Sequence, residues 1–209
     1  MNRTPIKLYR HPLSGHCHRV ELMLSLLGLR YETVEIDFVE REQKAPWFLA
    51  LNPFGEVPVI DDEGTVVHDS NAILVYLARR YDHEHRWLPQ DAKAQADVQV
   101  WFSAAAGPIA FGPARSRVCN LFGRDDDKAG PVALGHRLLA VMEGVLGGRA
   151  FLAAAAPTLA DIAAYSYVVV APEGDVELAP YPCVRGWLAR IEALPGFVPM
   201  RRSAVGLAA

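Results

Sequence analysis

Residues 52–60 read Asn-Pro-Phe-Gly-Glu-Val-Pro-Val-Ile, and Pro58 stands where a strand begins. A proline that enters a strand cannot donate a ladder hydrogen bond, so its presence needs a reason. One reason is a cis bond between Val57 and Pro58, a form found in roughly 5–6% of X-Pro bonds in folded proteins. The alternative is a trans proline at the first residue of the strand. A cis bond turns the N–H and C=O of Val57 outward, where an extended peptide can pair with them.

The residues before this stretch predict a strand, a helix and a second strand. Residues 6–9 alternate in polarity, apolar side chains then recur at helical spacing up to Leu27, and Gly28 ends that pattern. Residues 34–38 alternate apolar and acidic side chains, which is the period of a half-buried strand. The order predicts a βαβ unit of minimum size with two parallel strands.

The residues after Pro58 predict a hairpin and a helix. The strand at 57–60 meets the turn cluster Asp-Asp-Glu-Gly at 61–64 and returns as Thr-Val-Val-His at 65–68. Residues 69–71 offer N-capping side chains for a helix that follows. A βαβ unit followed by ββα predicts a four-stranded mixed sheet flanked by helices.

The second half of the chain predicts helices alone. Residues 83–90 are charged and contain proline, so they are interpreted as a linker. Thr158 and Asp161 have the spacing of a capping box, in which each side chain bonds the other residue's backbone amide. Helical patterns are predicted at roughly 91–106, 131–146, 158–170 and 182–193.

Composition excludes several classes of function. The formal net charge is −3 and no basic block occurs, so a nucleic-acid partner is not expected. No apolar run is long enough for a membrane span, and the N-terminus lacks the apolar region of a secretory signal. Three widely separated cysteines indicate a reducing, cytoplasmic environment. Adjacent Cys17 and His18 without a second ligand pair do not make a zinc site, so no metal is expected.

Two further positions are suited to binding an anionic or amino-acid ligand. Ser14 lies between the first strand and the first helix, where it either caps the helix or donates a hydrogen bond to an anion. With Cys17 it resembles a CxxC pair whose first thiol is replaced by a hydroxyl, which can stabilise a thiolate brought by a ligand. Asp69 and Ser70 begin a helix, where a carboxylate suits an ammonium group and backbone amides suit a carboxylate.

In this order, these features resemble the cytosolic glutathione S-transferase family, of the bacterial, serine-type, theta- or beta-like kind, over essentially the whole chain. The matching residues are Leu8-Tyr9, Pro12-Leu13-Ser14, Arg19-Val20, Leu27-Gly28-Leu29, Tyr31-Glu32, Asn52-Pro53-x-Gly55-x-Val57-Pro58, Asp69-Ser70-x-Ala72-Ile73-x-x-Tyr76-Leu77, Thr158-x-x-Asp161 and Tyr181-Pro182 with Trp187. The resemblance implies a thioredoxin-like N-terminal domain at 1–82, an all-helical C-terminal domain at 90–209, and a homodimer.

The resemblance also implies an enzyme that activates the thiol of glutathione, its co-substrate, for attack on a small hydrophobic electrophile. Ser14 matches the catalytic hydroxyl, Val57 and a cis-Pro58 match the clamp on the cysteinyl unit, and Asp69 and Ser70 match the γ-glutamyl site. Lys44 matches a residue that reaches the glycine carboxylate.

The sequence leaves other interpretations of the same site open. Cys17 competes with Ser14 as the catalytic group. A glutathione-dependent disulfide reductase or peroxidase, and a non-catalytic binding protein of the same fold, are alternative functions. The electrophile site is expected between the domains, with candidate lining residues Trp101, Phe102, Ile109, Phe111 and Arg115.

Overall fold

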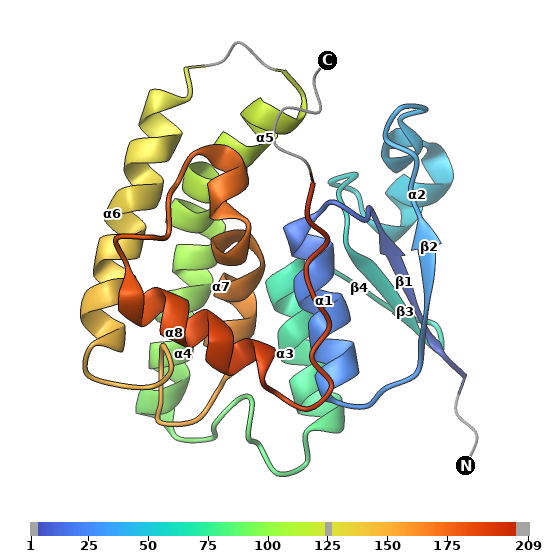
Figure 1. Cartoon of the computed structure of the whole chain (residues 1–209). Helices are drawn as coiled ribbons and strands as arrows, with labels where there is room; N and C mark the ends of the chain where they lie inside the picture. The colour runs from blue at the N-terminus through green and yellow to red at the C-terminus, as the bar shows by residue number, and fades with distance from the viewer. Residues whose placement is uncertain (1–3, 124–126, 204–209) are drawn as a thin grey trace.

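The first half of the chain folds as a four-stranded mixed sheet with helices on both faces (Figure 1). The computed structural model describes residues 4–123 and 127–203. The strands run in the order β2-β1-β3-β4, with β1 and β2 parallel and the other neighbours antiparallel. The elements are β1 (Ile6–Arg10), α1 (Gly15–Leu26), β2 (Tyr31–Glu35), the 3-10 turn η1 (Glu42–Lys44), α2 (Pro46–Leu51), β3 (Val59–Asp62), β4 (Thr65–His68) and α3 (Ser70–Tyr81).

The second half is helical throughout its described part, and α1 and α3 lie between its helices and the sheet (Figure 1). Its elements are α4 (Ala92–Ala104), the π-helix η2 (Ala105–Ala114), α5 (Arg115–Leu121), α6 (Ala129–Leu146), α7 (Leu159–Val169), the 3-10 turn η3 (Ala171–Gly174) and α8 (Pro182–Glu192). This confirms the predicted thioredoxin-like domain followed by an all-helical domain.

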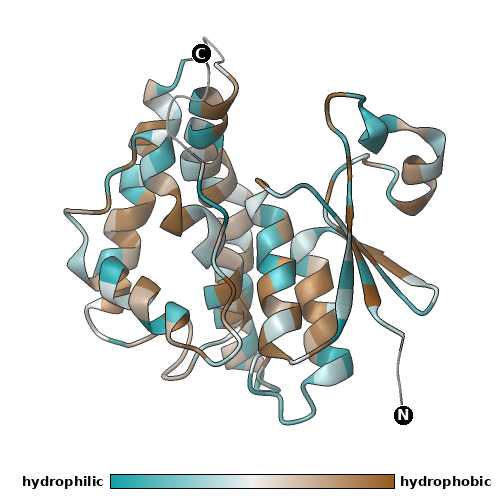
Figure 2. Cartoon of the chain, turned by 45° about the vertical axis from the view of Figure 1, so that its right-hand side comes forward, coloured by the Kyte–Doolittle hydropathy of each residue, from teal (hydrophilic) through white to brown (hydrophobic). Residues whose placement is uncertain are grey.

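Side-chain alternation along β1 builds two cores of unequal size. Leu8 belongs to the large core that continues through α1 and α3 into the helical half. Tyr9, on the other face of the strand, packs with Phe48 of α2 in a small second core. Successive strand residues point to opposite faces, so one strand serves both layers. Figure 2 shows apolar segments along the strands and along the helices beside them.

Two segments differ from the sequence prediction. The second strand ends at Glu35 instead of continuing to residue 38, because Asp37 folds the chain into a turn. The Asp37 carboxylate accepts hydrogen bonds from the amides of Val39 at 2.8 Å and Glu40 at 3.1 Å. The helical path also continues through η2 and α5, where Pro108 and Pro113 interrupt the apolar period that sequence reasoning follows.

The predicted capping box at the start of α7 is present, and it is fully buried. Asp161 accepts hydrogen bonds from the amide of Thr158 at 2.8 Å, the amide of Leu152 at 2.9 Å and the indole of Trp187 at 2.9 Å. One carboxylate therefore joins three separate segments of the helical domain.

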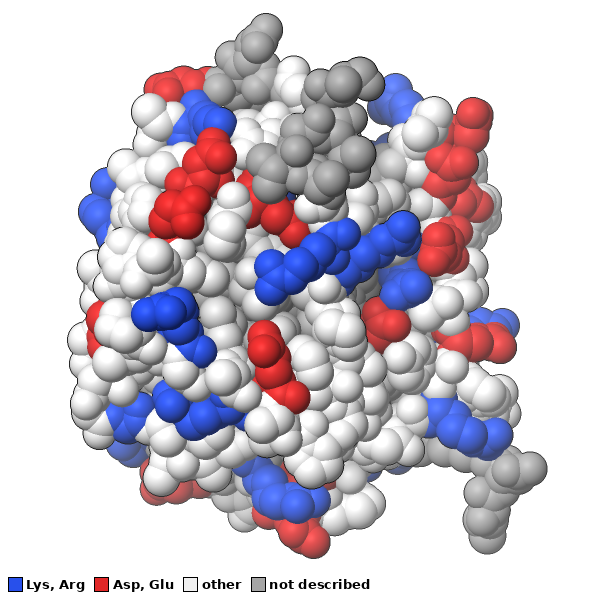
Figure 3. Space-filling view, in the orientation of Figure 1, with Lys and Arg blue, Asp and Glu red and all other residues white. Residues whose placement is uncertain are grey.

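Charge and hydropathy of the described part agree with the composition. Figure 3 shows acidic and basic side chains interspersed over the face that it draws. Within residues 4–123 and 127–203, no helix is long and apolar enough to cross a membrane.

Candidate functional site

A pocket of about 280 Å³ opens beside the Val57-Pro58 step. The peptide bond between these residues is cis, as predicted. Asn52 supports the preceding loop, because its side chain donates a hydrogen bond to the Glu56 carbonyl at 2.7 Å. The pocket is lined by His16, Asn52, Phe54, Glu56, Val57, Pro58, His68, Asp69 and Ser70. Four of the six residues predicted for the site, Val57, Pro58, Asp69 and Ser70, thus share one cavity.

Asp69 and Ser70 form the edge of this pocket at the N-terminus of α3. Asp69 has a φ of 68°, and its Oδ1 accepts hydrogen bonds from the amides of Asn71 at 3.0 Å and Ala72 at 2.9 Å. Both bonds use the same oxygen, so Oδ2 takes no part in capping the helix. The Asp69 carboxylate therefore both caps α3 and presents negative charge to the pocket.

Beneath Ser70 lies Arg19, a buried cation to which sequence reasoning gave no role in the site. Its side chain is 1% exposed, and Nη1 donates to Ser70 Oγ at 3.1 Å and to Asn71 Oδ1 at 2.9 Å. Burial lowers the pKa of Arg19 to about 10, so the guanidinium stays charged at neutral pH. A positive charge under a helix N-terminus favours a carboxylate ligand there.

His16 also lines the pocket, and it is a neutral base there. Its Nδ1 lies 3.4 Å from Ser70 Oγ. Burial, followed by the charge of Arg19, lowers the pKa of His16 to about 3. His16 and His68 were both missed as pocket residues; the signal available for His16 was its position two residues after Ser14.

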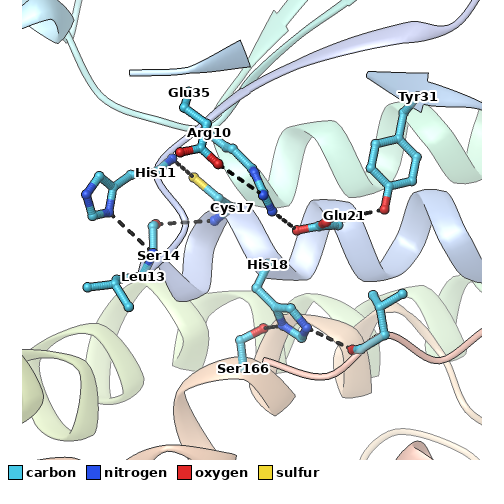
Figure 4. Close-up of polar contacts among 11 residues, drawn as sticks. Arg10, His11, Leu13, Ser14, Cys17, His18, Glu21, Tyr31, Glu35 and Ser166 are labelled. Atoms are coloured by element: carbon cyan, nitrogen blue, oxygen red, sulfur yellow. Dashed lines mark hydrogen bonds and ion pairs between the residues drawn. The ribbon is translucent and has the colours of Figure 1, made fainter. Parts of the chain in front are cut away.

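Ser14 caps α1 at the end of a tight loop (Figure 4). Its Oγ accepts a hydrogen bond from the amide of Cys17 at 3.3 Å, and its own amide donates to the His11 carbonyl at 3.0 Å. The side chain of His11 in turn accepts from the amide of Leu13 at 3.4 Å. The loop thus places the Ser14 hydroxyl at the positive end of α1.

Cys17 is poorly suited to act as a nucleophile. Its thiol is 1% exposed and accepts a hydrogen bond from the His11 amide at 3.5 Å. Burial raises the pKa of Cys17 to about 11. At neutral pH about one thiol in ten thousand is then ionised, whereas reactive cysteines have a lowered pKa and are partly exposed. The geometry favours Ser14 over Cys17 as the group that meets a ligand thiol.

The helical domain holds the Ser14 loop in place through a side chain of α5. Arg117 on α5 is 2% exposed, and its Nη1 donates to the Leu13 carbonyl at 2.7 Å. Its Nε forms an ion pair with Glu173 at 2.6 Å, and Glu173 also accepts from the amide of Ser203 at 3.2 Å. Sequence reasoning missed Arg117, because 104 residues separate it from Leu13 and no local pattern connects them.

His18 makes a second connection between the domains (Figure 4). Its ring nitrogens lie 2.8 Å from the Ser166 hydroxyl on α7 and 2.9 Å from the Val198 carbonyl. Burial lowers the pKa of His18 to about 4, so the ring is neutral and bridges a hydroxyl and a carbonyl. The histidines near Cys17 therefore have separate structural partners, and within the described ranges no three His, Cys, Asp or Glu side chains gather as a metal site.

Lys44 is not part of the pocket lining, but it contacts Phe54, which is. Its Nζ donates to the Phe54 carbonyl at 3.0 Å, and its side chain crosses Gly55, where an added Cβ would lie 2.7 Å from Nζ. Gly55 has a φ of 61°, so glycine is favoured at this crossing for two reasons.

The residues suggested for an electrophile site stay a prediction, and three of them lie in different surroundings. Ile109 is in the core, Phe111 is 66% exposed, and Trp101 lies in a groove between α4 and α6. A hollow of about 640 Å³ adjoins the Ser14 loop on the side of the β2–η1 turn. It is lined by His11, Pro12, Glu35, Ile36, Asp37, Phe38, Val39 and Phe122.

Comparison with known proteins identifies the family. Residues 13–80 match the model described as the glutathione S-transferase N-terminal domain, and residues 132–195 match the glutathione S-transferase C-terminal domain. Glutathione S-transferase 3 of Zea mays is 33% identical over 208 residues, which cover 92% of this chain and 91% of the relative. This chain belongs to the glutathione S-transferase family.

Solved structures of other transferases share the whole fold. A glutathione S-transferase from Pseudomonas fluorescens superposes with a TM-score of 0.89 at 33% identity, covering 95% of this transferase and 100% of the other. A glutathione transferase homolog from Lodderomyces elongisporus, solved with two GSH per subunit, has a TM-score of 0.81 at 26% identity and covers 92% and 95% of the two chains.

Proposed function

We propose that this transferase binds glutathione along the pocket beside cis-Pro58 and that Ser14 activates its thiol for attack on a small hydrophobic electrophile. The observation that carries the proposal is the convergence of Val57, Pro58, Asp69 and Ser70 on one pocket. The γ-glutamyl end then lies at the start of α3, over the charge of Arg19, and the cysteinyl backbone pairs with Val57. The thiol points toward the N-terminus of α1.

The energy required of Ser14 is within the range of known interactions. Lowering a thiol pKa from ~8.5 by about two units takes roughly 2.7 kcal/mol. A hydrogen bond to a charged group supplies about 1.5–3 kcal/mol, and a helix N-terminus adds roughly 0.3–1 kcal/mol. The Ser14 hydroxyl at the start of α1 therefore suffices to keep much of the bound thiol ionised near neutral pH.

The binding site is tested by Asp69→Asn. Asparagine is as good an N-cap as aspartate, so the variant keeps α3 intact while it removes the negative charge that pairs with the glutathione ammonium. Charge-assisted hydrogen bonds contribute about 1.5–3 kcal/mol, so the Kd for glutathione should rise roughly tenfold to a hundredfold. Isothermal titration calorimetry measures this change directly.

Asp91→Asn is the matched control, because Asp91 caps α4 in the same way and lies away from the pocket. Its Kd for glutathione should equal that of the unaltered protein. If the Kd is unchanged in Asp69→Asn, the γ-glutamyl group does not bind at this end of the pocket.

Lys44 is proposed to leave the Phe54 carbonyl and to bind the glycine carboxylate of glutathione. Lys44→Gln tests this in the same titration, and an unchanged Kd contradicts the proposal.

The electrophile is proposed to occupy the hollow between the Ser14 loop and Phe122. Phe38 stacks on His11 at a centroid distance of 4.8 Å, which gives this hollow an aromatic wall beside the loop.

The alternative use as a disulfide reductase through Cys17 is disfavoured by the burial of that thiol. If the protein turns over 2-hydroxyethyl disulfide faster than 1-chloro-2,4-dinitrobenzene, the reductase is favoured over the transferase.

A homodimer is proposed through the groove of about 400 Å³ between α4 and α6. Val100 and Val141 on its rim are 62% and 61% exposed, and Phe54 is 69% exposed elsewhere on the surface. The groove also carries Asp97 on α4 and Arg137 on α6, so a two-fold axis would place opposite charges against each other. Sedimentation equilibrium should give twice the chain mass at micromolar concentration, and a monomer would refute the dimer.

The cytoplasm is the proposed location, supported by the three free cysteines Cys17, Cys119 and Cys183. Fractionation of the source cells would contradict this if the protein were recovered outside the cytoplasmic fraction.

A further inference from the structure

The peptide bond between Leu13 and Ser14 is held at both of its polar groups. Its C=O accepts a hydrogen bond from Arg117 Nη1 at 2.7 Å, and its N–H donates to the His11 carbonyl at 3.0 Å. The first bond comes from the helical domain and the second from within the loop. A peptide is planar, so holding its N–H and its C=O fixes the whole unit.

The orientation of this peptide decides where the Ser14 hydroxyl lies. Ser14 has a φ of −80° and a ψ of 119°, and its Oγ accepts from the amide of Cys17 at 3.3 Å (Figure 4). The Cα–Cβ bond of Ser14 follows from the peptide before it, so a turn of that peptide moves Oγ away from the start of α1. A displacement of about 1 Å at a reacting group is enough to lower a rate up to a hundredfold.

Arg117 is itself built into rigid surroundings. Its Nε pairs with the Glu173 carboxylate at 2.6 Å, and Asn120 on the same helix donates to the Glu173 carbonyl at 2.8 Å. A Cβ added at Gly174 would lie 2.5 Å from the Arg117 amide nitrogen, so η3 packs on bare backbone of α5. The base of the Arg117 side chain is therefore held as firmly as its guanidinium.

The stability of the fold does not by itself account for this arginine. A buried ion pair loses the hydration of both charges, and apolar side chains of similar volume often replace one without loss of stability. Within residues 4–123 and 127–203, Nη2 of Arg117 is also buried without a hydrogen-bond partner, which adds a further cost. The bond from Nη1 to the Leu13 carbonyl is the contact that gives this costly group a use.

We propose that Arg117 is a positioning residue for the reaction, because it fixes the Leu13–Ser14 peptide and so holds the Ser14 hydroxyl where the glutathione sulfur binds. The proposal rests on the proposed role of Ser14. Arg117 touches neither glutathione nor the electrophile, and the thiol proton leaves to solvent without passing through it. Activation of the thiol then depends on the helical domain as well as on the domain that carries Ser14.

The ion pair is best removed as a whole, so that no buried charge is left without a partner. Arg117→Met combined with Glu173→Gln does this, because methionine fills similar space and glutamine still accepts from the Ser203 amide. Amide hydrogen exchange, followed by NMR in the enzyme without glutathione, reports on the loop directly. We expect the Ser14 amide to exchange about tenfold faster in the double variant, since its peptide has lost one of two anchors.

The acidity of bound glutathione reports on the reaction. The ultraviolet absorbance of the thiolate, followed through a pH titration of the enzyme with bound glutathione, gives the thiol pKa. In the double variant this pKa should rise by about one unit, half of the shift asked of Ser14. The kcat for 1-chloro-2,4-dinitrobenzene should then fall close to tenfold at pH 6 and recover by about pH 8.5, where the thiol is ionised in both proteins. The Kd for glutathione at pH 6 should stay nearly constant, because the pocket is untouched.

Arg190→Met is the matched control in the same domain. Arg190 on α8 also donates through its Nε to a backbone carbonyl, that of Ala150, at 2.9 Å. This variant should lower the melting temperature and leave both the thiol pKa and the exchange of the Ser14 amide unchanged. The comparison separates a role in the site from a role in packing.

Arg117→Lys is a second test that does not depend on the double variant being soluble. Lysine keeps the positive charge beside Glu173, but its single ammonium group lacks the fork that reaches two partners at fixed angles. We expect it to pair with Glu173 and release the Leu13 carbonyl, so the thiol pKa should rise as in the double variant. An unaltered thiol pKa in Arg117→Lys would show that the charge suffices, and would overturn the role in fixing the peptide.

Two further results would overturn the inference. If the Ser14 amide exchanges at its original rate in the double variant, Arg117 does not fix the peptide. If exchange is faster but the thiol pKa is unchanged, Arg117 holds the loop without serving the reaction. Failure of the proposed function is recognised separately, because the unaltered enzyme would then bind glutathione without forming thiolate near neutral pH.

Discussion

Ser14→Ala should bind glutathione almost as tightly as the unaltered transferase and conjugate it about 10²–10³-fold more slowly. In the proposed site, glutathione is held through the Val57 backbone and the start of α3, which the substitution leaves in place. The proposed role of the hydroxyl is to stabilise the charge that develops at sulfur, and loss of one such preorganised donor typically lowers kcat by about this factor. The rate with 1-chloro-2,4-dinitrobenzene and the calorimetric Kd for glutathione check the two halves of the prediction.

Ser14 also caps α1, so the experiment must separate an effect on catalysis from an effect on the stability of that helix. An N-cap Ser→Ala change costs about 1 kcal/mol, whereas Ser→Gly costs a few tenths. Ser14→Gly should therefore lose as much rate as Ser14→Ala while melting nearer to the unaltered enzyme. Cys17→Ser, which keeps Ser14, should retain most of the rate. If Cys17→Ser loses the rate and Ser14→Ala retains it, the catalytic group is Cys17.

Asp161→Ala should destabilise the protein by about 3–5 kcal/mol, the largest effect on stability that we expect. The carboxylate is fully buried and accepts from Thr158, Leu152 and Trp187. Its removal leaves several buried donors unpaired, and each unpaired buried group costs roughly 1–3 kcal/mol. The whole free energy of unfolding of a domain is about 5–15 kcal/mol, so much of this variant should be insoluble or unfolded on expression.

Urea unfolding of the soluble fraction measures this loss against a matched control. Asp175→Ala removes another aspartate of the same domain, but that side chain is 48% exposed and pairs with Lys128 on the surface. Surface ion pairs contribute about 0–1 kcal/mol, and alanine at the φ of 61° of Asp175 adds a modest backbone cost. The loss of stability in Asp175→Ala should therefore stay well below that in Asp161→Ala. Equal unfolding midpoints for Asp161→Ala and Asp175→Ala would show that the buried network contributes little.

The parts of the fold that follow local rules were predictable. The hairpin at 57–68 and the capping box at Thr158 and Asp161 each depend on residues that are close in the chain. The cis bond before Pro58 was expected from the resemblance to the family, because the residues alone left a trans bond open. The path through η2 was not predictable, because Pro108 and Pro113 suppress the helical period while packing against α6 and α7 sustains a π-helix. In such a segment, tertiary contacts outweigh intrinsic propensity.

The same distinction between short-range signals and long-range contacts applies to the candidate site. Short-range signals such as turns, caps and strand ends were enough to predict a sheet with a proline where a strand begins, a helix start at Asp69 and a hydroxyl at Ser14. The role of Val57 and Pro58 as a clamp came from the resemblance to the family. The tertiary structure decided that Arg19 lies beneath Ser70 and that Cys17 is buried. It also decided that Arg117 bonds the Leu13 carbonyl and that the Tyr167 ring packs on Gly15, both from the helical domain. Contacts across more than a hundred residues leave no period in the sequence, because they arise when separately formed helices pack together.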